Sequence, residues 1–183
     1  MLPGISIELI VAAIFIILAF HSLIGGYRDR PLRVAFWLCA AVAATYTAPG
    51  WAWALPIQHL AFGAAGPLFV HLNLSGAITR RQAWIIYVPN LSLAAVAALF
   101  PDSQPLSGLV GVSLGISYVE WIIFSPSRIA AAARAIALAP FVALNLYVNL
   151  GILVTGTANE ALVRWQVLPA LVVVPLLLPP EKQ

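Results

Sequence analysis

The residues of this sequence that could do chemistry are few, and they stand inside or beside long apolar runs. His71, Glu120 and Arg134 lie in three different runs, and His21 lies near the end of a fourth. Ionisable groups inside an apolar environment are costly, and they indicate function by default. One interpretation is a single polar cluster in which Glu120 pairs with Arg134 or with protonated His71. The alternative is that these side chains neutralise one another or extend to the nearest polar boundary, without a binding role.

The three histidines, His21, His59 and His71, are also candidate ligands of a haem or of a chlorophyll-type pigment. His59 and His71 would be about 18 Å apart along one helix, so they cannot bind one metal ion together. We predict no metal site. The alternative, which we favour, is that each of the three is satisfied in the core or lies at a membrane interface.

Neutral polar residues and small residues form two further patterns. Asn145 and Asn149 are one helical turn apart and share a helix face, and with Asn90 they are expected to form a polar seam. Interhelical hydrogen bonds of this kind contribute about 1 kcal/mol each. A second pattern, a small residue at every fourth position, favours close packing of one helix against a neighbour; it consists of Ser107, Gly111 and Gly115. The spacing does not say whether that neighbour belongs to this chain or to another protein.

The sequence lacks the patterns of common enzyme classes. Its only lysine, Lys182, follows the last apolar run, which excludes a retinal Schiff base inside a run. No glycine-rich phosphate-binding loop and no Ser-His-Asp arrangement is indicated. The single cysteine, Cys39, lies within an apolar run and is predicted to be a buried small residue. We therefore predict a protein that is not an enzyme.

The elements that carry these residues are predicted to lie in a membrane. Hydrophobic residues make up 62% of the 183 residues and charged residues only 8%, with a mean hydropathy of +0.99. Ordinary soluble domains have roughly 45–50% apolar and 25% charged residues. A soluble fold of this length cannot bury so much apolar surface. The net charge of +3 is then explained by arginines on one side of a membrane, and no nucleic-acid partner is predicted.

The apolar runs predict an all-α integral membrane bundle of seven transmembrane helices, in a single domain that covers residues 1–183. A crossing needs about 20 helical residues. The predicted helices are Ile5–Gly25, Leu32–Thr47, Pro56–Ile78, Ala83–Phe100, Leu106–Phe124, Ser127–Thr155 and Trp165–Leu178. The last is short and contains two prolines.

Basic residues predict the orientation of this bundle. Seven arginines, from Arg28 to Arg134, lie in or beside the first, third and fifth connections, and Lys182 follows the seventh run. If these positions are cytoplasmic, eight of the nine basic residues lie inside, as the positive-inside rule requires. We therefore expect an outside N-terminus and a cytoplasmic C-terminus. We also expect a multi-pass location in a bacterial cytoplasmic (inner) membrane.

The middle of the chain carries a series of motifs in a fixed order. They are Leu55-Pro56-Ile57-Gln58-His59, Gly66-Pro67-Leu68-Phe69-Val70-His71, the arginine turn Arg80-Arg81 and Tyr87-Val88-Pro89. Together with the proline-bearing run from Leu168 to Leu176, this series resembles the multi-helix membrane input region of bacterial sensor histidine kinases of the competence-pheromone sensor type. The resemblance implies a sensory membrane module in which His71 corresponds to a late-helix histidine of the family. In that family a kinase domain follows, whereas this sequence ends at Gln183, so kinase activity is not expected.

Two functions remain open. The first is an accessory or structural subunit of a larger respiratory or photosynthetic membrane complex. Such a subunit would pack against other integral membrane subunits and bind membrane lipid, quinone, carotenoid or a chlorophyll-type pigment. The second is a stand-alone sensory module that signals through a separate effector. We expect the accessory subunit, because the sequence shows no effector domain and the predicted outer connections are short.

Overall fold

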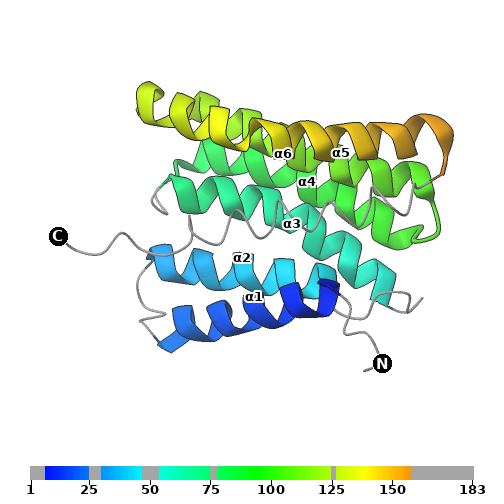
Figure 1. The fold of residues 1–183 in the computed structure, drawn as a ribbon, viewed down its shortest axis with the longest axis horizontal. Helices are drawn as coiled ribbons and strands as arrows, with labels where there is room; N and C mark the ends of the chain where they lie inside the picture. Colours follow the sequence, from blue (N-terminus) through cyan, green and yellow to red (C-terminus); the bar gives the residue numbers. More distant parts are fainter. Residues whose placement is uncertain (1–6, 25–29, 47–53, 75–77, 125–126, 158–183) are drawn as a thin grey trace.

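The computed structural model describes residues 7–24, 30–46, 54–74, 78–124 and 127–157. These residues form helices and no strand, which confirms the predicted all-α class. The six helices are α1 (Ile7–Ile24), α2 (Arg30–Tyr46), α3 (Leu55–Asn73), α4 (Arg80–Leu99), α5 (Gln104–Phe124) and α6 (Arg128–Thr155), shown in Figure 1. The predicted seventh helix, Trp165–Leu178, lies outside the described residues.

Four helical segments are long and apolar enough to cross a membrane. They are Ile7–Ile24, Arg80–Leu99, Gln104–Phe124 and Leu138–Thr155. The number of crossings that the described residues support is therefore smaller than the predicted seven. The apolar part of α2 is shorter, and α3 contains polar residues, including its two histidines, that lower its hydropathy.

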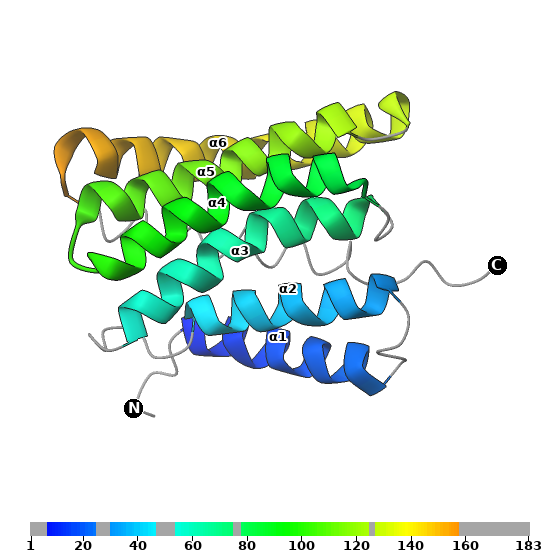
Figure 2. The same ribbon diagram turned by 180° about the vertical axis from the view of Figure 1, so that it is seen from behind.

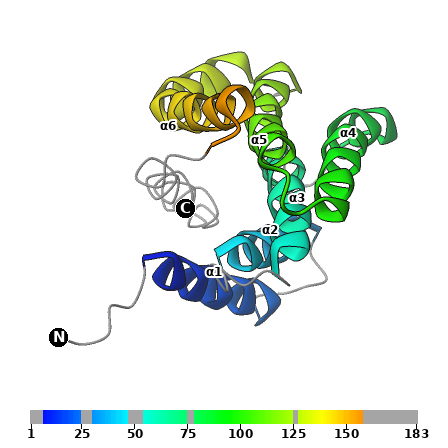
Figure 3. The same ribbon diagram turned by 90° about the vertical axis from the view of Figure 1, so that its right-hand side faces the viewer.

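Helix α3 lies at the centre of the bundle. It packs against α2, α4 and α5, while α1 packs against α2 and α6 packs against α5. The end-on view in Figure 3 shows α1 and α2 on one side of α3, with α5 and α6 on another. Figure 2 shows the same order of helices from behind. The centre of α3 contains Gly63, Ala65 and Gly66, and such small residues allow neighbouring helices to approach closely.

Apolar side chains fill the interfaces between neighbouring helices. Trp121 of α5 is 1% exposed and belongs to a cluster with Val70, Ile86 and Leu138 from the three other helices α3, α4 and α6. A second cluster joins α1 to α2, and it includes Cys39, which is buried as predicted. Helix α1 is thus attached through α2.

Two helix ends differ from the prediction because of local hydrogen bonds. Helix α4 begins at Arg80 instead of Ala83, since Thr79 and Gln82 form a capping box that satisfies free backbone N–H groups. Helix α3 ends at Asn73 instead of Ile78. The Asn73 side-chain amide donates to the Phe69 carbonyl oxygen at 2.9 Å, and such local bonds compete with continuation of a helix.

Candidate functional site

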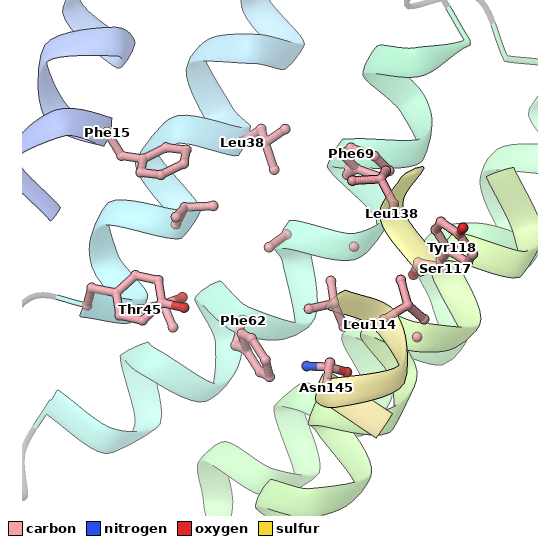
Figure 4. A pocket seen from close by; sticks show the side chains of 16 residues that line it. Phe15, Leu38, Thr45, Phe62, Phe69, Leu114, Ser117, Tyr118, Leu138 and Asn145 are labelled. Carbon is pink, nitrogen blue, oxygen red and sulfur yellow. The ribbon is translucent and has the colours of Figure 1, made fainter. Parts of the chain in front are cut away.

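A cavity of about 130 Å³ lies between five of the six described helices (Figure 4). For comparison, an apolar cavity of about 150 Å³ in another protein holds one benzene molecule. Helix α1 contributes one residue to the lining, and the other four helices contribute three or four each. The described lining residues are Phe15, Leu38, Val42, Thr45, Tyr46, Phe62, Ala65, Gly66, Phe69, Leu114, Gly115, Ser117, Tyr118, Leu138, Val142 and Asn145.

The wall of the cavity is mainly apolar. Phe15 of α1, Phe62 of α3 and Leu114 of α5 face it from three directions (Figure 4). Gly66 brings α3 close to α5, because a Cβ atom on Gly66 would lie 2.5 Å from the Ser117 hydroxyl oxygen. The surroundings of the cavity therefore suit an apolar molecule of about the size of one ring.

Three hydroxyl groups at the cavity already have hydrogen-bond partners. Thr45 Oγ1 donates to the Ala41 carbonyl oxygen at 3.0 Å, and Ser117 Oγ donates to the Ser113 carbonyl oxygen at 3.2 Å. The hydroxyl of Tyr118 donates to the carbonyl oxygen of Ala135 on α6. These bonds are made within the bundle, so the three hydroxyl groups have no proton left to donate to a ligand.

The side chain of Asn145 on α6 differs from these hydroxyl groups in its hydrogen bonding. It is only 6% exposed, and its Oδ1 atom is buried without a hydrogen-bond partner among the described residues. Its backbone carbonyl oxygen accepts a bond from Asn149 Nδ2 at 2.8 Å, but that contact does not involve the Asn145 side chain. Figure 4 shows the Asn145 amide nitrogen directed towards the space beside Phe62. The cavity therefore contains a buried amide with unused hydrogen-bonding capacity.

The residues of the predicted polar cluster lie on four different helices. His21 is exposed in the last turn of α1. His71 lies on α3, where its Nδ1 atom is 2.9 Å from the hydroxyl oxygen of Tyr87 on α4. Glu120 on α5 is half-buried, and its Oε2 atom has no partner within the described ranges. Arg134 lies on α6, and its side chain is outside the described part, so the Glu120–Arg134 pair remains a prediction.

His59 is buried in the second turn of α3, and its Nδ1 atom has no hydrogen-bond partner among the described residues. It does not line the cavity. Within the described ranges, no three His, Cys, Asp or Glu side chains are close enough together to hold a metal ion. The histidines thus stand separately, and a single-histidine haem or pigment site remains a prediction.

The predicted packing stripe faces another helix of the same chain. A Cβ atom on Gly111 would lie 1.9 Å from Asn149 Oδ1, and one on Gly115 would lie 2.5 Å from Leu146 of α6. Gly108, which the four-residue spacing did not include, is buried and also faces α6, whereas Ser107, the first residue of the predicted stripe, is half-buried. A Cβ atom on Gly108 would meet the Asn149 carbonyl oxygen at 2.8 Å. The neighbour that the spacing left open is therefore α6.

The three asparagines of the predicted polar seam lie in two separate interfaces. Asn90 lies between α3 and α4, since its backbone oxygen would be 3.3 Å from a Cβ atom on Gly63. Its Nδ2 atom donates to the Ile86 carbonyl oxygen of its own helix at 2.7 Å. Asn145 and Asn149 lie on α6, which packs against α5. Asn90 is thus separated from the cavity that Asn145 lines.

The phenylalanines of the cavity, Phe15, Phe62 and Phe69, were not identified from the sequence. Each stands in an apolar run among many similar residues, so composition gave no signal. A weak signal was present in α5, where Ser113 and Ser117 are one turn apart and both are buried. Comparisons with protein families, with curated proteins and with solved structures found no match for this chain.

Proposed function

We propose that the chain is a non-catalytic membrane subunit that binds a lipophilic molecule in its interhelical cavity and acts together with a partner protein. The cavity between α1, α2, α3, α5 and α6 is the observation that carries this proposal. Its lining is mainly apolar, and it is formed by residues far apart in the sequence, so a bound molecule would link both sides of the bundle.

The outer surface supports placement in a membrane. Several of its most exposed side chains are apolar, including Ile24 at 84%, Ile129 at 87% and Val154 at 82% exposed. Exposed apolar residues over several helices indicate contact with lipid or with another protein. An orientation with the N-terminus outside is part of the proposal and follows from the distribution of the arginines. A bacterial inner-membrane location is also part of the proposal, and it agrees with the resemblance to bacterial sensor kinases.

In the first form of this proposal, the chain is an accessory subunit of a larger respiratory or photosynthetic complex. The bound molecule would then be a lipid, a quinone or a pigment that stays with the complex. The subunit would contribute packing surface and a binding cavity, and the partner would carry the chemistry.

A second candidate is a sensory module that signals through a separate effector. It is favoured by the hydrogen bond between His71 and Tyr87. These residues belong to the late-helix histidine motif and the Tyr-Xaa-Pro motif, which together suggest the resemblance to sensor kinase input regions. In this form the ligand would bind reversibly, and its arrival would change the packing of α3 against its neighbours.

The test is purification of the tagged protein from its native membrane in mild detergent, followed by mass spectrometry of co-purified proteins and lipids. Leu114→Trp should fill the cavity and remove the lipophilic molecule, because Leu114 faces it (Figure 4). Ile116→Trp is the matched control, since Ile116 lies on the same helix and is exposed. Recovery with electron-transfer subunits would favour the accessory form, and recovery with a signalling enzyme would favour the sensory form. The absence of any molecule whose yield depends on Leu114 would contradict the binding function.

A further inference from the structure

The cavity also defines the chemistry of its ligand, an inference that rests on the proposed function. We propose that the ligand is an uncharged apolar molecule with one carbonyl or hydroxyl oxygen, and that Asn145 binds this oxygen. The proposal depends on one buried amide in a mainly apolar wall.

Burial of the Asn145 side chain costs free energy in the structure as it stands. An amide buried without a hydrogen bond loses its hydration and gains nothing in return. Asn145 is 94% buried, and its Oδ1 atom has no partner among the described residues. A leucine of similar size would fill this position without that cost. A ligand hydroxyl that donates to Oδ1 removes this cost, whereas a ligand carbonyl cannot donate and can only accept from the amide nitrogen.

The hydrogen-bonding groups of the Asn145 amide determine which ligand atom it can bind. An asparagine amide has two N–H donors and one carbonyl acceptor, and rotation about its last bond exchanges the two ends. Figure 4 shows the nitrogen on the side of the cavity that faces Phe62. A ligand carbonyl can accept from this nitrogen, and a hydroxyl can either accept or donate. Both groups therefore share the same requirement, a single uncharged oxygen.

The residues that line the cavity exclude a charged or highly polar ligand. The described lining contains no Asp, Glu, Lys, Arg or His side chain. The hydroxyl groups of Thr45, Ser117 and Tyr118 donate to carbonyl oxygens of the bundle. A phosphate or ammonium group would lose its hydration here without an opposite charge, which is strongly unfavourable. A phospholipid headgroup therefore does not fit, while the ring-sized end of an apolar ketone or alcohol does.

The experiment measures binding of three probes that differ only in this oxygen. They are phenyl decyl ketone, the corresponding alcohol and undecylbenzene. The full chain is reconstituted in lipid nanodiscs, tritiated ketone is bound to saturation, and the other two probes compete for it; direct binding of tritiated undecylbenzene is measured in parallel. The variants are Asn145→Leu, which removes the amide, and Thr45→Val, which removes a cavity hydroxyl that is already bonded to Ala41.

The wild-type protein should bind the ketone or the alcohol roughly 3- to 10-fold more tightly than undecylbenzene, the range expected for one net hydrogen bond. Asn145→Leu should lose this preference and keep its affinity for undecylbenzene. Thr45→Val should retain the preference. Circular dichroism and size-exclusion elution check that each variant is folded. If Asn145→Leu does not fold, equal affinity of the wild-type protein for the three probes still overturns the inference.

Two results would overturn the inference in different ways. Equal affinity for all three probes in the wild-type protein would show that the cavity binds apolar molecules without using Asn145. That result would leave the proposed binding function intact. If neither tritiated probe binds, the proposed binding function fails together with the inference.

Discussion

The imidazole Nδ1 atom of His71 lies 2.9 Å from the hydroxyl oxygen of Tyr87, and the two rings meet edge to face with their centroids 5.9 Å apart. This contact joins the last turns of α3 to the first half of α4. It borders the cluster of Val70, Ile86 and Trp121, against which Tyr87 packs. A polar bond and an aromatic contact therefore fix the same end of the α3–α4 interface.

Tyr87→Phe should lower the free energy of unfolding by about 1 kcal/mol, because it removes one hydroxyl and its hydrogen bond while keeping the ring. Thermal unfolding of the purified protein in detergent measures the change. Tyr147→Phe is the control, since Tyr147 is 69% exposed, and it should change the stability by less than about 0.5 kcal/mol. Equal effects of the two substitutions would show that the His71–Tyr87 bond contributes nothing.

Gly108→Ala should push α5 away from α6 and lower the free energy of unfolding. The added Cβ atom would meet the Asn149 carbonyl oxygen at 2.8 Å and the Leu153 nitrogen at 3.1 Å, and these are backbone atoms that cannot rotate away. Overpacking of this kind costs about 1–3 kcal/mol. Gly151→Ala is the matched control on α6, because nothing lies within 4 Å of its added Cβ atom. Denaturation of both variants in the same detergent should show a loss of stability for Gly108→Ala alone.

Trp121→Ala should be among the most destabilising single substitutions in the bundle. The side chain is 1% exposed and contacts residues of three other helices, so its removal leaves a large cavity. Substitutions of this type cost about 3–5 kcal/mol. Trp84→Ala removes a side chain that is 60% exposed, and it should cost less than about 1 kcal/mol. A similar loss for both, measured by heat-induced aggregation, would contradict the packing described for Trp121.

The predicted seventh crossing has a separate test. Reporter enzymes fused after Thr157 and after Gln183 should report opposite sides of the membrane, because the run Trp165–Leu178 is predicted to cross between them. Alkaline phosphatase activity and green fluorescent protein fluorescence of the two fusions show on which side of the membrane each fusion point lies. Reporters on the same side would remove the seventh helix from the topology.

Helix positions followed from the sequence more closely than helix ends did. All six described helices overlap the predicted runs, since long apolar segments bounded by Pro, Gly and charged residues are local signals. The start of α4 was misplaced by three residues because the capping box at Thr79 and Gln82 was not recognised. The end of α3 was misplaced because the apolar pattern continues past Asn73 to Ile78.

The candidate site was much less accessible to sequence reasoning. Asn145 and Asn149 were identified as a pair on one face of a helix, and the structure places both on α6. Nothing in their spacing indicated that Asn145 lines a cavity while Asn149 contacts Gly111. Asn90 was assigned to the same seam, yet it lies in the α3–α4 interface. Residue type indicated polar contacts, and the choice of partner depended on the packing of the helices.

The sequence by itself determined that this protein is a set of apolar helices. Helices form through hydrogen bonds between residues four apart, so local composition and stop signals are enough to locate them. Only the tertiary structure decided which side chains share a site. Apolar residues occur on exposed as well as buried faces of these helices, as Ile17 and Phe15 of α1 show. Periodicity therefore does not mark the buried face, and the rotation of each helix against its neighbours placed Phe15, Phe62 and Asn145 around one cavity.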